Sequence, residues 1–267
     1  MRLVVPLVPD ERAPLARANP AAKLAAAAIV MLALFVSLDW LTAAIVLIGL
    51  VAVLPWSGIR PRDLLARSWL ILLAAVSIGV FNVLFAAEQL GPTVVVIGPI
   101  RIGAQTLVDG IGLALRLVGI VLAGLLATAT TQPTDLADSL VQQLHVSPRF
   151  AVGALAAVRL LPLLAQEWQV LAMARRARGV EAGRSPIAGM RIFGGQMLAL
   201  LVGAIRRGTR MALAMEARGF GALPCRTSAR IQRMRPGDWA WIGGALLLAA
   251  LAVAVSVAVG AWRPLLG

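Results

Sequence analysis

The residues best suited to recognition chemistry are two arginines, Arg178 and Arg218, that close two similar stretches of sequence. They form the tripeptides Ala177-Arg178-Gly179 and Ala217-Arg218-Gly219. An alanine also lies one helical turn before each arginine, at Ala174 and Ala214. Small side chains let a partner approach closely, and a guanidinium that projects beyond them can make a forked contact to a carboxylate. Two equivalent ends on one chain suit two equivalent protein partners.

The same tripeptides also have a simpler explanation. Helices commonly end with basic residues in the last turn and a glycine just after it, because cations offset the negative end of the helix dipole and glycine adopts the left-handed conformation. In a chain rich in Ala and Arg, the tripeptide can also recur by chance. From these residues alone, docking ends and ordinary basic helix ends stay equally open.

Other kinds of chemistry find few residues to support them. The chain has one lysine, Lys23, which Asn-Pro-Ala-Ala precedes, so a phosphate-binding G-x-x-x-x-G-K-[ST] loop cannot be formed. With His145 as the one histidine and Cys225 as the one cysteine, neither an imidazole or thiolate metal site nor a Ser/His/Asp or Cys/His constellation can be assembled. We therefore expect no catalytic residues, no metal site and no cofactor bound by this chain, which is not predicted to be an enzyme.

The composition indicates a membrane protein. Of the 267 residues, 60% are hydrophobic and 14% are charged, whereas soluble domains average about 45–50% and about 25%. The formal net charge of +13 suits either nucleic acid or the basic cytoplasmic loops of a membrane protein. The distribution of the basic residues decides between these two explanations.

The apolar runs predict five spans, of which the first two are short. They cover residues 24–38, 41–54, 68–87, 111–129 and 239–262. Ser37 to Trp40 interrupts what would otherwise be one overlong helix. Four basic residues precede the first span and three follow the second, whereas the loop at 88–105 has only Arg101. By the positive-inside rule, the N-terminus is cytoplasmic and the C-terminus lies outside.

This topology divides the chain into four parts. Residues 1–23 form a cytoplasmic N-terminal segment, 24–130 a transmembrane region with four spans, 131–238 a cytoplasmic region of helices, and 239–267 a C-terminal transmembrane helix. The cytoplasmic region holds fifteen of the 25 basic residues and both Ala-Arg-Gly motifs. Its helices are predicted from the capping threonines near Thr134, from Ser147-Pro148 to the first motif, and from about Gly195 to the second. The predicted fold is an all-α polytopic membrane protein with a cytoplasmic α-helical coupling region.

Two arginines interrupt apolar stretches. Arg159, together with Pro162, makes its helix more typical of an interfacial or protein-packed helix than of a span. Arg116 lies inside the fourth span, where a charge is costly and faces protein or water. A structural bond between helices and a role in a transport or coupling pathway both fit Arg116, and the sequence does not separate them.

In order and spacing, the chain resembles the transmembrane T component of energy-coupling-factor (ECF) transporters, the CbiQ-like family of ABC-type importers. The resemblance covers nearly the whole length, although no single piece of it is specific. It rests on Asn19-Pro20 with Lys23 and Leu24, on Arg116 with the threonines of 128–131 and Pro133, on Arg159 to Pro162 with Glu167, on the first Ala-Arg-Gly, and on 214–220 with Arg226-Thr227.

The resemblance implies a mechanism and partners. Two ABC-type ATPase subunits would bind ATP and Mg²⁺, and a membrane-embedded S component would capture a vitamin or a transition-metal ion. Arg178 and Arg218 would dock on the ATPases, with the flanking Ala and Gly residues shaping the two ends. ATPase closure would draw the helices together and tilt the S component. The protein would lie in the bacterial inner (cytoplasmic) membrane. Neither the substrate, nor a shared S component, nor the identity of the two ATPases follows from the sequence.

Two other classes of function predict different sequence patterns. A stand-alone secondary transporter or channel favours ionisable residues at the midplane and inverted repeats, and only Arg116 fits this pattern. A membrane-anchored binder of nucleic acid or lipid surfaces favours dense basic runs interleaved with aromatic residues. Here the arginines stand at helix ends between apolar faces, so we expect no nucleic-acid partner and contact with the lipid bilayer as a spanning protein.

Overall fold

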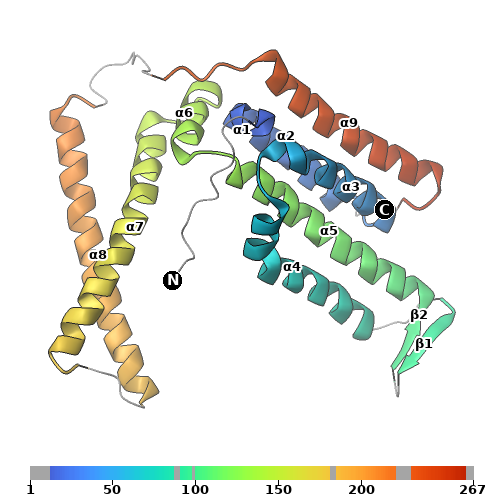
Figure 1. Cartoon of the computed structure of the whole chain (residues 1–267), viewed down its shortest axis with the longest axis horizontal. Coiled ribbons are helices and arrows are strands. Elements are labelled where there is room, and N and C mark those ends of the chain that lie inside the picture. Colours follow the sequence, from blue (N-terminus) through green and yellow to red (C-terminus); the bar gives the residue numbers. More distant parts are fainter. Residues whose placement is uncertain (1–12, 87–90, 98–99, 181–184, 221–229, 263–267) are drawn as a thin grey trace. The chain divides into compact units, whose positions relative to one another are not determined.

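The computed structural model describes residues 13–86, 91–97, 100–180, 185–220 and 230–262. Its chain is almost entirely helical, so the predicted all-α class is confirmed. The elements are α1 (Pro14–Arg17), α2 (Pro20–Val36), α3 (Trp40–Ser57), α4 (Pro61–Leu84), β1 (Thr93–Ile97), β2 (Ile100–Gly103), α5 (Ala104–Ala129), α6 (Pro133–Gln143), α7 (Pro148–Ala177), α8 (Pro186–Ala217) and α9 (Pro236–Ala258) (Figure 1). Contacts divide them into two units.

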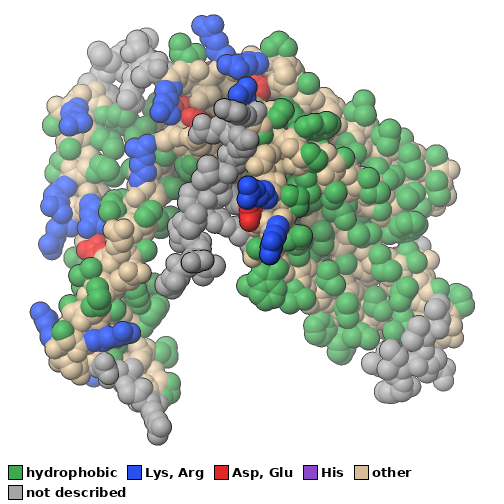
Figure 2. Space-filling model, in the orientation of Figure 1, with side chains coloured by type: hydrophobic (Ala, Val, Ile, Leu, Met, Phe, Trp, Pro, Cys, Tyr) green, Lys and Arg blue, Asp and Glu red, His purple; other side chains and the backbone are tan. Residues whose placement is uncertain are grey.

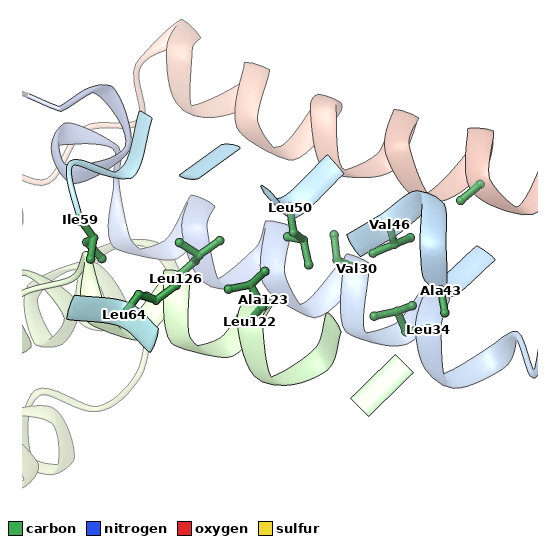
Figure 3. Packing of buried hydrophobic residues seen from close by; sticks show 11 residues of the cluster. Val30, Leu34, Ala43, Val46, Leu50, Ile59, Leu64, Leu122, Ala123 and Leu126 are labelled. Atoms are coloured by element: carbon green, nitrogen blue, oxygen red, sulfur yellow. The ribbon is translucent and has the colours of Figure 1, made fainter. Parts of the chain in front are cut away.

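The first unit comprises Met1–Ser139 and Gln232–Gly267, and α2, α3, α5 and α9 form its core. Val30 and Leu34 of α2 meet Val46 of α3 and Leu122 of α5 in one buried cluster (Figure 3). Small residues on α5 allow this close packing: a methyl group at Gly119 would lie 3.0 Å from the Leu34 side chain. These helices are therefore held by tight apolar contact, as small residues permit in membrane bundles.

Local sequence signals start and stop the first helices. The Asn19 side chain accepts a hydrogen bond from the Ala21 N–H (2.9 Å), and Pro20 takes the first position of α2. Asp39 caps α3 by accepting from the Thr42 N–H (2.7 Å). The break predicted between two short spans at 37–40 is thus a pair of helix ends.

The link between α4 and α5 corrects the sequence-based expectation of a plain loop at 88–105. Strands β1 and β2 pair there as an antiparallel hairpin, with Ile97 opposite Ile100 and Thr93 opposite Gly103. The cause is the run Thr-Val-Val-Val-Ile, because β-branched residues favour strands and Gly-Pro pairs flank the run as turn formers.

The second unit, Leu140–Ile231, is built on the long helices α7 and α8. They cross one another, and α8 runs back so that its C-terminal end and that of α7 lie at opposite ends of the crossed pair (Figure 1). The prediction that this arm begins near Gly195 is wrong, because α8 begins at Pro186. The Ser185 side chain accepts a hydrogen bond from the Ala188 N–H (3.4 Å). The Ser-Pro sequence is the same as at the start of α7, although Ser147 makes no side-chain cap bond. Glycines in mid-helix lower stability without ending the helix.

Among the described residues, five helices are long and apolar enough to cross a membrane. Their number equals the predicted number of spans, but they are not all the same segments. They are α3, α5, α7, α8 and α9, whereas α2 and the apolar part of α4 (Ser68–Leu84) are shorter. In Figure 2, Lys and Arg side chains are spread along α7 and α8, whereas in the first unit they gather toward one side and hydrophobic side chains cover most of the rest of the visible face. Length and composition identify a multi-pass membrane protein, but they do not decide whether α7 and α8 cross the membrane.

Candidate functional site

The two Ala-Arg-Gly motifs form the same helix end. At the first, the Gly179 N–H donates to the Arg176 carbonyl (2.9 Å) and the Val180 N–H to the Arg175 carbonyl (3.0 Å). At the second, the equivalent residues Gly219 and Phe220 donate to the Glu216 and Met215 carbonyls at 2.9 and 3.0 Å. This pattern satisfies carbonyls that the end of a helix would leave without partners. The predicted helix ends are present, with one geometry.

The glycine of each motif is needed for its backbone conformation. Gly179 and Gly219 both have φ of 73°, in the left-handed region that residues with a Cβ rarely adopt. The preceding arginines also match, with φ and ψ of −91° and 8° at Arg178 and −89° and 11° at Arg218. The two backbones therefore present their arginines in the same way.

Both arginines are open to a partner. Ala177, Arg178 and Gly179 are exposed, and so are the equivalent residues of the second motif. Within the described parts of the chain, neither the Arg178 nor the Arg218 guanidinium makes a hydrogen bond or an ion pair. An exposed alanine beside an uncommitted guanidinium is the arrangement that the sequence predicted at both ends.

Arg175 behaves differently, and its role was not recognised from the sequence. Its Nη1 donates to the backbone carbonyl of Ile192 in α8 (2.7 Å), and a methyl group on Gly195 would lie 3.2 Å from its Nη2. The spacing of two helical turns from Trp168 to Arg175 was the available signal, since Trp168 also faces α8 and packs edge-on against Phe193 at 5.4 Å. Arg175 holds the crossing, which leaves Arg176 and Arg178 for contacts elsewhere.

A second contact at the crossing joins residues that the sequence did not link. Arg207 of α8 lies 3.1 Å from Glu167 of α7, and each side chain is about a third exposed. Glu167 stands as many residues before Arg178 as Arg207 stands before Arg218, so equivalent positions of the two arms meet. Neither the motifs nor the hydrophobic periodicity could have predicted this pair, because both residues look like solvent-facing charges.

Arg116 lies where α2 ends and α3 begins. Its Nη2 donates to the backbone carbonyl of Ser37. Close by, Asp39 also accepts from the Ser256 hydroxyl of α9 (2.6 Å). Burial raises the pKa of the Asp39 carboxyl, but hydrogen bonds from Ser256 and Thr42 outweigh burial, so its pKa lies below the ordinary value. At Arg116 the structure provides an interhelical bond, which is one of the two roles that its sequence position allowed.

The opposite end of the first unit carries another set of polar ties. The Lys23 Nζ donates to the carbonyls of Ala16 (3.1 Å) and Thr130 (2.8 Å), and the Asn19 N–H donates to Asp238 Oδ1 (2.8 Å). These contacts join α1, α2, the end of α5 and the start of α9. They lie beside the two places where the chain leaves this unit for the second, after residue 139 and before residue 232. Across the described residues, no three His, Cys, Asp or Glu side chains come together as a metal site would require.

Comparison with known proteins gives one consistent family. A family model described as cobalt transport protein (CbiQ) matches residues 11–228. The energy-coupling factor transporter transmembrane protein EcfT of Lacticaseibacillus paracasei is 36% identical over 154 residues, 54% of this chain and 58% of that protein. EcfT 1 of Listeria monocytogenes is 30% identical over 220 residues, covering 77% and 79%, and EcfT of Thermosediminibacter oceani is 28% identical over 232 residues, covering 84% and 86%. The chain thus spans just over half the length of the Lacticaseibacillus relative.

Proposed function

We propose a coupling mechanism for this chain, which belongs to the CbiQ family of cobalt transport proteins and is a transmembrane T component of an energy-coupling factor transporter. In the proposal, two partner ATPases dock on the ends of α7 and α8, and closure of the ATPase pair on ATP moves these helices. The movement reaches a membrane-embedded S component that carries the substrate. This chain then transmits force and performs no chemical step.

The observation that carries the proposal is the pair of congruent helix ends. Arg178 and Arg218 sit on superimposable backbones, are exposed, and have no partner within the described residues. A planar guanidinium free of internal bonds is suited to a bidentate contact with a carboxylate. Two such ends on one chain match two ATPase subunits better than they match a single partner.

Membership of the family supports the partners and cargo in this proposal. ATP and Mg²⁺ belong to the ATPase subunits, and the cargo is a vitamin or a transition-metal ion, of which cobalt is the ion in the family's description. Both docking ends must then face the cytoplasm, with the N-terminus inside and the C-terminus outside the inner membrane. If α7 and α8 both crossed the bilayer, the end of one would face each side, so the proposal requires both helices to stay on the cytoplasmic side.

Charge reversal at the two ends tests the docking. Arg178→Glu or Arg218→Glu should each cost about 2–5 kcal/mol of ATPase binding at its own end, which is the range for breaking one partner of a buried charge pair. The double variant should lose nearly all ATPase, because each end holds its own subunit. The measurements are ATPase recovered with the tagged chain, and uptake of Co²⁺ and of a panel of vitamins.

A matched control is available on the same helix. Arg206 is exposed, and its backbone carbonyl accepts a hydrogen bond from Arg210 Nε. Arg206→Glu therefore changes the charge by the same amount as the motif variants but lies outside both motifs. It should leave both ATPase recovery and uptake near the unmodified level. Normal complex yield and normal uptake in the Arg178→Glu, Arg218→Glu double variant would remove the docking assignment.

A further inference from the structure

The two docking ends share one backbone but differ in charge. Two residues before each motif arginine stands Arg176 at the first end and Glu216 at the second. Both residues are exposed, and their carbonyls accept the equivalent bond from the glycine N–H at the same 2.9 Å. A cation and an anion therefore occupy the same place on two matching surfaces.

The neighbouring positions do not offset this difference. Arg175 is committed to the Ile192 carbonyl, and the equivalent Met215 is uncharged and half-buried. Within the described residues, the first end thus presents two cations without an internal partner, Arg176 and Arg178, whereas the second presents Glu216 with Arg218. Residues two apart on a helix do not face the same way. Position 176 or 216 consequently contacts a different part of a partner from the part that the motif arginine contacts.

Helix stability does not explain Glu216. An anion in the last turn opposes the helix dipole and is slightly destabilising, whereas Arg176 at the matching place is favourable. In the described part of the chain, the Glu216 carboxylate makes no hydrogen bond or ion pair that would offset this cost. An exposed residue that weakens its own helix and has no internal partner points to a contact outside the chain.

We propose that Arg176 and Glu216 determine which ATPase subunit each end accepts, an inference that rests on the docking function above. The first end fits a docking groove that carries a carboxylate on its rim, and the second fits a groove that carries a lysine or arginine there. Complementary charges at an interface rim set specificity and association rate more than affinity, and a like charge in the same place rejects the wrong partner. The two ATPases are therefore not interchangeable between the ends.

The test uses the intact complex of this chain with its co-expressed ATPases. A photo-crosslinking amino acid replaces Ala174 or Ala214, which are exposed, equivalent, and outside both the motifs and positions 176 and 216. Cross-linked peptides identify the groove that each end occupies. Ala174 should cross-link beside an acidic rim and Ala214 beside a basic rim, on different ATPase polypeptides.

Charge variants then test the cause. Arg176→Glu should reduce cross-linking only from position 174, and Glu216→Arg only from position 214, each on the order of fivefold at low salt, as expected for an exposed ion pair. Added salt should shrink both effects by screening. Arg176→Gln and Glu216→Gln should give smaller losses in the same direction with little change to the helix. The variant carrying both reversals should exchange the two ATPases between the ends.

The outcomes separate this inference from the docking proposal. If both ends cross-link to the same residues of one ATPase and neither reversal changes the yields, the assignment of Arg176 and Glu216 is overturned. Arg178→Glu and Arg218→Glu run in parallel. If these two variants abolish cross-linking at their own ends while changes at 176 and 216 do nothing, docking stands and only the rim assignment falls. If they leave cross-linking intact, the docking proposal itself fails.

Discussion

The first unit is held by contacts between residues that are far apart in the sequence. Asp238, at the start of α9, accepts from the backbone of Asn19 at the start of α2, and Lys23 binds the Thr130 carbonyl at the end of α5. In α5, 33% of the apolar stretch is buried inside the protein. Several helices are thus fixed to each other at both ends and along an apolar core, so this unit should respond to force as one body.

In the described part of the second unit, helices α7 and α8 touch through a few contacts at one crossing. Glu167 meets Arg207, Trp168 meets Phe193, and Arg175 binds the backbone of α8. Only 6% of the apolar stretch of α7 or α8 is buried. The two helices are 30 and 32 residues long and so extend about 45 Å each. The first unit is therefore the more rigid of the two, whereas the second leaves the C-terminal ends of α7 and α8 exposed.

The largest expected difference between the units concerns the membrane itself. In a Cys225→Ser background, Ala177→Cys and Ala217→Cys should both resist a membrane-impermeant maleimide in intact cells and react fully after permeabilisation. Val259→Cys, which is exposed just beyond α9, should react in intact cells. The expectation follows from the proposed topology, in which α7 and α8 lie on the cytoplasmic side and α9 crosses the membrane. Labelling of only one of the two motif cysteines from outside would mean that α7 and α8 both span the bilayer.

The next effect should separate a residue that ties elements together from one that only caps a helix. Asp238→Ala removes acceptors for the backbone N–H groups of Asn19 and Arg235, so we expect a loss of about 2–4 kcal/mol in the stability of the first unit. Asp63→Ala, in the first turn of α4 and exposed, should lose only a few tenths to about 1 kcal/mol. Thermal unfolding of the purified protein measures both. Equal shifts in the two variants would contradict the tie between α2 and α9.

The smallest effect is expected at the crossing of the second unit. Glu167→Ala removes an ion pair whose side chains are 36% and 33% exposed, so we expect a loss of at most about 1 kcal/mol, reduced further by salt. Amide hydrogen exchange in α7 and α8 should rise near the crossing and stay unchanged in the first unit. Arg206→Ala, one residue away from the pair, serves as the control. A change in exchange across α2 or α9 would show that the crossing also stabilises the membrane bundle.

Local signals in the sequence are sufficient to predict many of the helix ends in this structure. The alanine, arginine and glycine of each motif predicted a helix end, and the backbone of Gly179 and Gly219 adopts the conformation for which glycine is used. The start of α8 was missed although Ser185-Pro186 repeats the signal used at Ser147-Pro148. Helix α8 runs without a break through the Gly194-Gly195 pair, where the Arg175 guanidinium lies close to Gly195.

Contacts that depend on topology could not be predicted from the sequence. The tie from Asn19 to Asp238 and the bond from Arg116 to Ser37 join residues with no shared period or motif. The Arg175 contact to α8 depends on where two helices cross, which their individual patterns do not determine. Composition also fails to separate α2 from α7, since α7 is long and apolar enough to cross while α2 is slightly short. These features follow from three-dimensional packing, so they emerge only with the fold.

The sequestration of Lys23 has a practical consequence for anyone who wishes to study this protein by covalent labelling. Its ammonium is the sole ε-amino group of the chain, is 4% exposed, and is engaged by two backbone carbonyls. Acylating reagents such as succinimidyl esters will therefore find no side-chain amine on the surface. Bifunctional reagents of that class would link the side-chain amines of neighbouring subunits and find none exposed on this chain, so its place in an assembly is better mapped with thiol, guanidine or photoactivated chemistry.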